Sequence, residues 1–191
     1  MNKRGAIIAI SAPSGTGKTS IVKRIINEIP GLIFSVSATT RKKRENEKNG
    51  VDYFFISEKE FKEKIKNNEF VEWEKVYDYY YGTFKKVIEE NINNGRSVIL
   101  EVDVKGALSI KKIYKEANLI YVIPPSHDEL IRRLKNRKTD NDTDIKKRLE
   151  RAIMELSIKD KFDYFVVNKD LDKAISDTRN IINNILNKEN N

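Results

Sequence analysis

The sequence predicts an α/β fold in which helices flank a parallel β-sheet. Nearly continuous apolar runs begin near residues 6, 97, 119 and 164, as is typical of parallel strands that are buried on both faces. Stretches with apolar residues at helical spacing alternate with these runs. The length of 191 residues suits one such domain with a small insertion.

The elements follow one another along the chain in this alternating order. The expected strands are Ala6–Ile10, Ile33–Ser37, Tyr53–Ile56, Ser97–Val102, Leu119–Ile123 and Tyr164–Val167. The expected helices are Lys18–Glu28, a segment that opens at Ser57, Thr83–Asn93, Ser126 to about Arg137, Thr143–Ile158 and Leu171–Asn187. The helices at Ser57 and Ser126 each open with a capping box, Ser-x-x-Glu, in which the serine side chain accepts a hydrogen bond from a backbone N–H.

The segment between the first strand and the first helix carries a phosphate-binding motif. It reads Ala12-Pro13-Ser14-Gly15-Thr16-Gly17-Lys18-Thr19, with alanine where the usual motif has its first glycine. Glycine lets backbone N–H groups turn toward an anion, and the next helix directs its positive end at the same point. The lysine can reach the β- and γ-phosphates, and the Thr19 hydroxyl can ligate Mg²⁺. We therefore expect the parallel sheet of a P-loop NTPase.

Composition excludes several other classes. The chain has no cysteine, which excludes disulfides and thiolate metal sites and fits a cytoplasmic protein. The apolar stretch behind the basic start Met1–Arg4 is too short for a signal peptide. No run approaches the roughly 18 apolar residues of a membrane span. The net charge of +8 suits polyphosphate ligands, and no basic stripe with interleaved aromatics indicates a nucleic acid partner.

Two segments interrupt the alternation of strands and helices. Residues 36–94 contain short strands and many aromatic residues, and we expect them to form an inserted subdomain on a core made of residues 1–35 and 95–191. The polar, turn-rich segment 138–143 has arginines on both sides. We expect a mobile lid at about 133–148.

The insertion carries a further set of motifs. They are Ser35-Val36-Ser37-Ala38-Thr39-Thr40-Arg41-x-x-Arg44, Asn49-Gly50-Val51-Asp52-Tyr53, Asn68-Glu69-Phe70-Val71-Glu72-Trp73 and Tyr80-Tyr81-Gly82-Thr83. Together with the phosphate loop and with Arg133, Arg137, Arg148 and Asn168 further on, they resemble the guanylate kinases of bacteria. The resemblance extends from Ala6 to about Leu186 and implies transfer of the γ-phosphoryl of ATP to GMP, and to dGMP, with Mg²⁺.

The resemblance also assigns roles to residues. Arg41, Arg44, Tyr53 and Tyr81 match contacts to the GMP phosphate, and Ser37, Glu72 and Thr83 match the residues that recognise guanine. Glu101 and Asp103 match residues near Mg²⁺ and GMP, although the family usually has aspartate at the first of these positions, and Asn168 matches a contact to the adenine of ATP. The groups expected to stabilise the transferring phosphoryl are Lys18, Arg41, Arg133, Arg137 and Arg148. Lys43, Asn46, Asp78 and Lys138 depart from the family pattern in loops.

Simpler structural interpretations apply to some of these residues. The run Arg41–Arg44 could be a solvated basic loop. We expect Trp73 and Phe70 to lie in the core of the insertion, and His127 and Arg132 to lie on the surface.

Two other functions remain as alternatives. A GTPase switch is suggested by Asp103-Val104-Lys105-Gly106 and by Asn168-Lys169-Asp170, but leucine at 171 breaks the second motif. An inactive, peptide-binding relative of the kinases is opposed by the presence of Lys18 and Thr19. The sequence leaves the oligomeric state open.

Overall fold

A five-stranded parallel sheet forms the centre of the molecule. The computed structural model describes residues 4–76, 78–135 and 142–190, without the side chains of 142–148 and 189–190. The strand order is β2-β7-β1-β8-β9, and every neighbouring pair is parallel. These strands are β1 (Ile7–Ser11), β2 (Ile33–Phe34), β7 (Val98–Glu101), β8 (Asn118–Ile123) and β9 (Tyr164–Val167). The predicted α/β fold is therefore confirmed.

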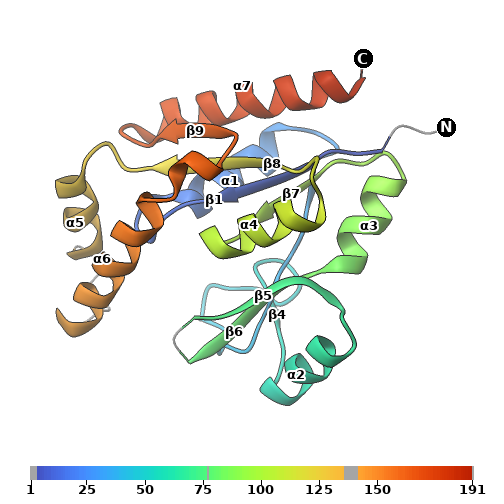
Figure 1. The fold of residues 1–191 in the computed structure, drawn as a ribbon, viewed down its shortest axis with the longest axis horizontal. Helices are drawn as coiled ribbons and strands as arrows, with labels where there is room; N and C mark the ends of the chain where they lie inside the picture. Colours follow the sequence, from blue (N-terminus) through green and yellow to red (C-terminus); the bar gives the residue numbers. More distant parts are fainter. Residues whose placement is uncertain (1–3, 77, 136–141, 191) are drawn as a thin grey trace.

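Helices cover both faces of this sheet (Figure 1). They are α1 (Lys18–Glu28), α3 (Lys85–Asn93), α4 (Val104–Ile113), α5 (His127–Lys135), α6 (Asp142–Leu156), the 3-10 turn η1 (Lys159–Lys161) and α7 (Leu171–Asn190). Successive side chains of a strand point to opposite faces, so Ile8 and Ile10 pack with α1 and α7 while Ile7 and Ala9 pack with α3 and α4. Packing on both faces holds β1 and β7 in place, and with them the edge of the sheet at which these two strands end.

A second, smaller sheet lies beside the first, at the lower side of Figure 1. Its order is β4-β3-β6-β5, with β3 (Ala38–Thr39), β4 (Phe54–Phe55), β5 (Phe70–Val76) and β6 (Tyr79–Phe84). Helix α2 (Glu58–Lys66) closes its core by stacking Phe61 on Phe70, with ring centroids 4.5 Å apart. Gly82 makes room for this stack, because a Cβ there would lie 2.9 Å from the Phe61 ring.

Several predicted elements have different bounds. The expected strand 33–37 ends at Phe34, because the chain leaves the first sheet there and enters the second at Ala38. The expected helix 83–93 begins only at Lys85, because Thr83 pairs with Glu72 in the hairpin β5–β6. The predicted helix 18–28 and the serine caps at Ser57 and Ser126 are confirmed.

The sequence patterns missed β3, β5, β6 and α4. Strand β5 carries two glutamates on one face, so it lacks the apolar run of the strands in the first sheet. Helix α4 buries Val104, Ala107 and Ile110 and is capped by Asp103, whose Oδ1 accepts a hydrogen bond of 2.8 Å from the Gly106 N–H. That local bond explains the Asp-x-x-Gly motif as a helix cap.

One core prediction is wrong. The residue Trp73 is 48% exposed, because on β5 it alternates with Glu72 and Glu74, which line a cavity on the other side of the strand. Its neighbour Phe70 is buried, as expected, and His127 is exposed. Among the described residues, no helix combines the length and hydropathy that a membrane crossing needs.

Candidate active site

A cavity of about 560 Å³ lies where the two sheets face each other. Its wall includes the loop after β1, the residues after β7, and side chains of β5 and β6. Ligands of open parallel sheets bind beyond the carboxyl ends of the strands, and this cavity has that position. A second cavity of about 1050 Å³ shares Arg41, Tyr53 and Glu101 with the first and extends toward α1.

The phosphate loop connects β1 to α1 as predicted. Gly15 and Gly17 have φ angles of 92° and 87°, which side chains other than hydrogen disfavour. No side chain caps the start of α1, so the first N–H groups of this helix are available to an anion. All of Ala12, Pro13, Ser14, Gly15, Thr16, Gly17, Lys18 and Thr19 line the cavity.

Two side chains of this loop contact the end of β7. The Lys18 Nζ donates a hydrogen bond of 2.6 Å to the Val102 carbonyl. The Thr19 hydroxyl donates one of 2.6 Å to a carboxylate oxygen of Glu101. Both side chains therefore join the phosphate loop to adjacent residues at the end of β7.

Asn168 holds the phosphate loop through a hydrogen bond and does not line the cavity. Its side-chain amide is buried and donates a hydrogen bond of 2.6 Å to the Thr16 carbonyl. A Cβ on Gly17 would lie 2.6 Å from the same amide nitrogen, so the loop packs closely on it. Arg133 donates to Glu129 at 2.7 Å and to the Asn168 carbonyl at 3.0 Å, and it is not part of the cavity wall.

The three residues predicted to recognise guanine form one chain of polar contacts. The Thr83 hydroxyl donates a hydrogen bond of 2.6 Å to a Glu72 carboxylate oxygen, and the Ser37 hydroxyl lies 3.3 Å from Thr83 Oγ1. Burial raises the pKa of Glu72 to about 7, and the nearby Asp103 and Glu74 act in the same direction. This carboxylate is therefore poorly solvated, and no described basic side chain forms a hydrogen bond with it, which favours a ligand that can donate to it.

The residues predicted to contact the GMP phosphate line the same cavity as Ser37 and Glu72. Arg41, Arg44, Tyr53 and Tyr81 all line the cavity. The Arg41 guanidinium makes two hydrogen bonds to Glu47, of 2.7 and 3.0 Å, and lies 5.6 Å from the Tyr53 ring centroid. The hydrogen bonds from Arg41 hold the pKa of Glu47 below its usual value. The negatively charged Glu47 carboxylate therefore neutralises the Arg41 guanidinium.

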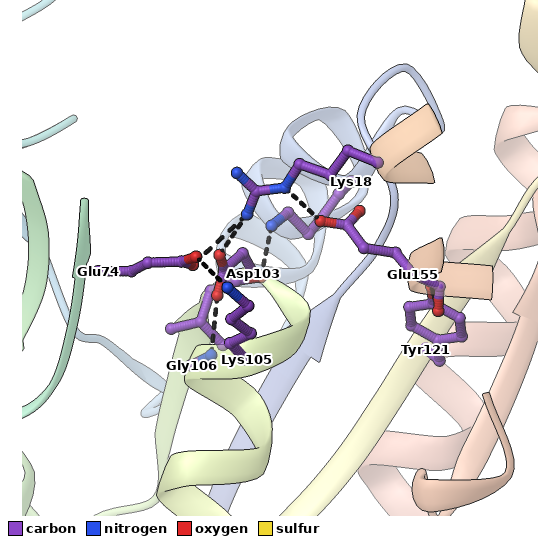
Figure 2. Close-up of polar contacts among 9 residues, drawn as sticks. Lys18, Glu74, Asp103, Lys105, Gly106, Tyr121 and Glu155 are labelled. Atoms are coloured by element: carbon purple, nitrogen blue, oxygen red, sulfur yellow. Dashed lines mark hydrogen bonds and ion pairs between the residues drawn. The ribbon is translucent and has the colours of Figure 1, made fainter. Parts of the chain in front are cut away.

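Asp103 belongs to a network of charges that connects three elements (Figure 2). Arg151 of α6 donates hydrogen bonds of 2.7 Å each to Asp103 and Glu155, and its guanidinium lies 3.4 Å from Glu74 of β5. Lys105 donates a hydrogen bond of 3.0 Å to Glu74. Burial and the proximity of Asp103 raise the pKa of Glu74 to about 7.

The sequence analysis did not identify Glu47, Glu74, Arg151 or Glu155. Two signals were available: Glu74 lies two residues after Glu72 and so shares its strand face, and Arg151 stands four residues before Glu155 on a helix. The predicted Arg137 lies outside the described residues. Arg148 lies within α6, and its side chain is also outside the description.

Comparisons with known proteins agree on one family. A family model described as guanylate kinase matches residues 4–185. The guanylate kinase of Thermotoga maritima is 46% identical over 172 residues, which are 90% of this chain and 83% of that protein. The guanylate kinase of Caldanaerobacter subterraneus is 44% identical over 182 residues, covering 95% of this chain and 88% of that protein.

Solved structures agree as well. The crystal structure of guanylate kinase from Anaplasma phagocytophilum has a TM-score of 0.79 at 29% identity, and the match covers 96% of this chain and 87% of that one. The phosphate loop lines one cavity with Ser37 and Glu72, and both sequence and structure match the same relatives. The chain belongs to the guanylate kinase family.

Proposed function

We propose that the protein transfers the γ-phosphoryl group of ATP to GMP, giving ADP and GDP, and that it also accepts dGMP. One observation carries the proposal: the phosphate loop and the Glu72 carboxylate line the same cavity. A triphosphate held by the loop and a purine held by Glu72 would therefore direct their phosphates toward each other, as in-line transfer requires.

The polar chain of Ser37, Thr83 and Glu72 suits guanine. Guanine presents N1–H and N2–H₂ as donors and O6 as an acceptor. The Glu72 carboxylate would accept from both nitrogens, and a hydroxyl of Ser37 or Thr83 would donate to O6. Adenine would place an acceptor against the carboxylate and leave the carboxylate without a donor. This unpaired group should disfavour AMP relative to GMP by several powers of ten, roughly 10⁴-fold.

The GMP phosphate would bind where Arg41 now contacts Glu47. Exchange of the carboxylate for a phosphate keeps a bidentate contact, because both groups fit the guanidinium fork. Arg44 would add charge, and the hydroxyls of Tyr53 and Tyr81 would donate beside it. The phosphate itself is the nucleophile, so no histidine base is required.

The other half of the cavity would hold ATP and Mg²⁺. Lys18 would contact the β- and γ-phosphates, and Asn168 would lie on the adenine side. The residues present fit Mg²⁺, because Thr19 and Glu101 provide oxygen atoms and Mg²⁺ is commonly held by one or two protein groups together with substrate phosphates and water. Within the described parts of the chain, no cluster of three or more histidine, cysteine or acidic side chains could hold a metal alone.

The division of the chain proposed from the sequence follows the same logic. Residues 1–35 and 95–191 would form the core that binds ATP, and residues 36–94 would form the insertion that binds GMP. Arg133, Arg137 and Arg148, in the lid at about 133–148, would close over the transferring phosphoryl. The protein would act in the cytoplasm on free nucleotides, without a nucleic acid partner.

A coupled assay of ADP formation tests the proposal. Purified protein is mixed with ATP, Mg²⁺ and one of GMP, dGMP, AMP, CMP or UMP. We expect turnover with GMP, weaker turnover with dGMP, and little with the others. Preference for AMP or UMP would refute guanine recognition. Tight GTP and GDP binding without GMP turnover would support the switch alternative, and a folded protein that forms no ADP would support the inactive module.

A further inference from the structure

Helix α6 contacts the second sheet through Arg151. The guanidinium has three carboxylate neighbours, of which Asp103 and Glu155 belong to the core and Glu74 belongs to β5 of the second sheet. The side chain of Arg151 is 31% exposed and that of Glu74 is 18% exposed, so this contact is shielded from water more than an ordinary surface ion pair. A single side chain therefore joins two parts of the molecule that are far apart in the sequence.

The base of this arrangement is fixed. The buried Tyr121 of β8 donates a hydrogen bond of 2.8 Å to the Glu155 backbone carbonyl, which anchors the end of α6 on the first sheet. Arg151 stands one turn earlier on the same helix and lines the cavity. Figure 2 shows Glu74, Asp103 and Glu155 around the region into which Lys18 also points.

The network lies next to the guanine-recognition carboxylate. Glu74 and Glu72 share a face of β5, and a Cβ on Gly106 would lie 2.8 Å from Glu72 Oε2 and 3.2 Å from Asp103 Oδ1. Without Arg151, the carboxylates of Glu74 and Asp103 would lie close together beside Glu72. The Lys105 side chain, which bonds to Glu74, is 77% exposed, and the Lys18 Nζ bonds to the Val102 carbonyl. Repulsion would then move Glu74 and Asp103 apart and disturb Glu72 beside them.

We propose that Arg151 is a positioning residue for GMP, which holds Asp103 and Glu74 in place beside Glu72 and couples the second sheet to helix α6. The inference rests on the proposed function and adds a residue to it. Because Asp103 and Glu74 lie beside Glu72, on the GMP side of the cavity, loss of Arg151 affects GMP more than ATP.

Steady-state kinetics of four proteins test the inference: wild type, Arg151→Gln, Glu74→Gln and the double variant. We expect Arg151→Gln to raise KM for GMP about fivefold or more, an effect of the size that residues in direct contact have on one another. KM for ATP should change less. The double variant should be no worse than Arg151→Gln alone, because both changes remove one interaction. Arg151→Lys should recover part of the loss, since it restores the charge without the fork.

Arg132→Gln is the matched control, because Arg132 is an exposed arginine on helix α5 whose ion pair among the described residues is with Glu129. Thermal denaturation of each variant separates an altered site from reduced folding, because unfolding lowers the active fraction and leaves KM unchanged. If wild type turns over GMP and Arg151→Gln has the KM of Arg132→Gln, or if the two network variants add fully, the inference is wrong. If wild type neither binds nor phosphorylates GMP, the proposed function itself is wrong and this inference with it.

Discussion

The two halves of the cavity are built from different parts of the chain and different chemical groups. On the phosphate-loop side, the groups proposed to bind the ligand are mainly backbone N–H groups of residues 12–19, of which Pro13 has none, together with one lysine and one hydroxyl. On the opposite side, the groups are side chains of residues between 37 and 83, drawn from β5, β6 and the loops around β3 and β4. The first side is encoded locally, and the second exists only once the second sheet has formed.

The halves also differ in what their side chains contact before a ligand arrives. Lys18 contacts a backbone carbonyl, which a phosphate can replace without leaving a buried charge behind. Arg41 and Arg151 are held by carboxylates, and Glu72 is held by the Thr83 hydroxyl. A ligand that binds on this side must therefore replace these internal hydrogen-bond partners. The free energy of binding here depends on charge and pH more than it does on the phosphate-loop side.

The largest expected effect is a loss of kcat from a change on the phosphate-loop side, where a single lysine acts together with backbone groups. Lys18→Ala should lower kcat by about 10³-fold, because it removes the only loop cation from the transferring phosphoryl. KM for GMP should change little, since the opposite side is intact. Steady-state assays with both substrates varied give this comparison. Arg24→Ala, on the outer face of the same helix and paired with Glu28, is the control; equal activity of Lys18→Ala and this control would contradict the role.

The second effect acts on the guanine side. Glu72→Gln should lower kcat/KM for GMP by about 10²-fold and narrow the preference for GMP over AMP, because an amide accepts only part of the donor edge. KM for ATP is the internal reference and should stay within about twofold of wild type, because the two sides use separate groups. An unchanged preference for GMP would contradict guanine recognition by Glu72.

The same substitution should stabilise the fold at alkaline pH. The folded-state pKa of Glu72 is about 7, above the ordinary value of 4.5, so ionisation costs stability as the pH rises from 4.5 to about 7. The full difference corresponds to at most about 3 kcal/mol, and to less here because part of the side chain is open to the cavity. Denaturant unfolding of wild type and Glu72→Gln at about pH 5 and pH 8 should therefore favour the variant only at the higher pH.

This contrast also explains how far the sequence could be interpreted. Residues 12–19 carry their own geometry, since positive φ at Gly15 and Gly17 and the open start of α1 follow from local sequence. In the sheet β3–β6, the sequence predicted only β4 as a strand, within an insertion that carries motifs. Strand β5 was missed because Glu72 and Glu74 face a cavity and break the apolar pattern of a buried strand. The spacing of Arg151 and Glu155 was visible in the sequence, but the contacts of Arg151 with Asp103 and Glu74 were not, because these partners lie 48 and 77 residues away along the chain.

A third effect comes from a backbone position between the halves. Gly106→Ala should raise KM for GMP about tenfold, because the new methyl group would displace the Glu72 carboxylate, which now lies 2.8 Å from that point. Stability should not fall much, since Gly106 lies inside helix α4, where alanine is favoured by about 1 kcal/mol. Parallel kinetics and thermal melts separate the two effects; a lower melting temperature with unchanged KM would contradict the packing argument.

The smallest expected effect tests whether the guanine side, and not the loop side, responds to pH. Only the ionised carboxylate of Glu72 accepts from both guanine nitrogens, and burial has raised its pKa to about 7, with Asp103 and Glu74 adding to the rise and Lys18 opposing it. Binding then competes with protonation, so KM for GMP should increase about fourfold as the pH falls from about 8 to about 6.5. The phosphate of GMP also titrates near pH 6, at about the value of other phosphate monoesters, and contributes equally in wild type and in Glu72→Gln. The difference between the two pH profiles therefore isolates the carboxylate, and parallel profiles would show that Glu72 is already ionised in the free protein.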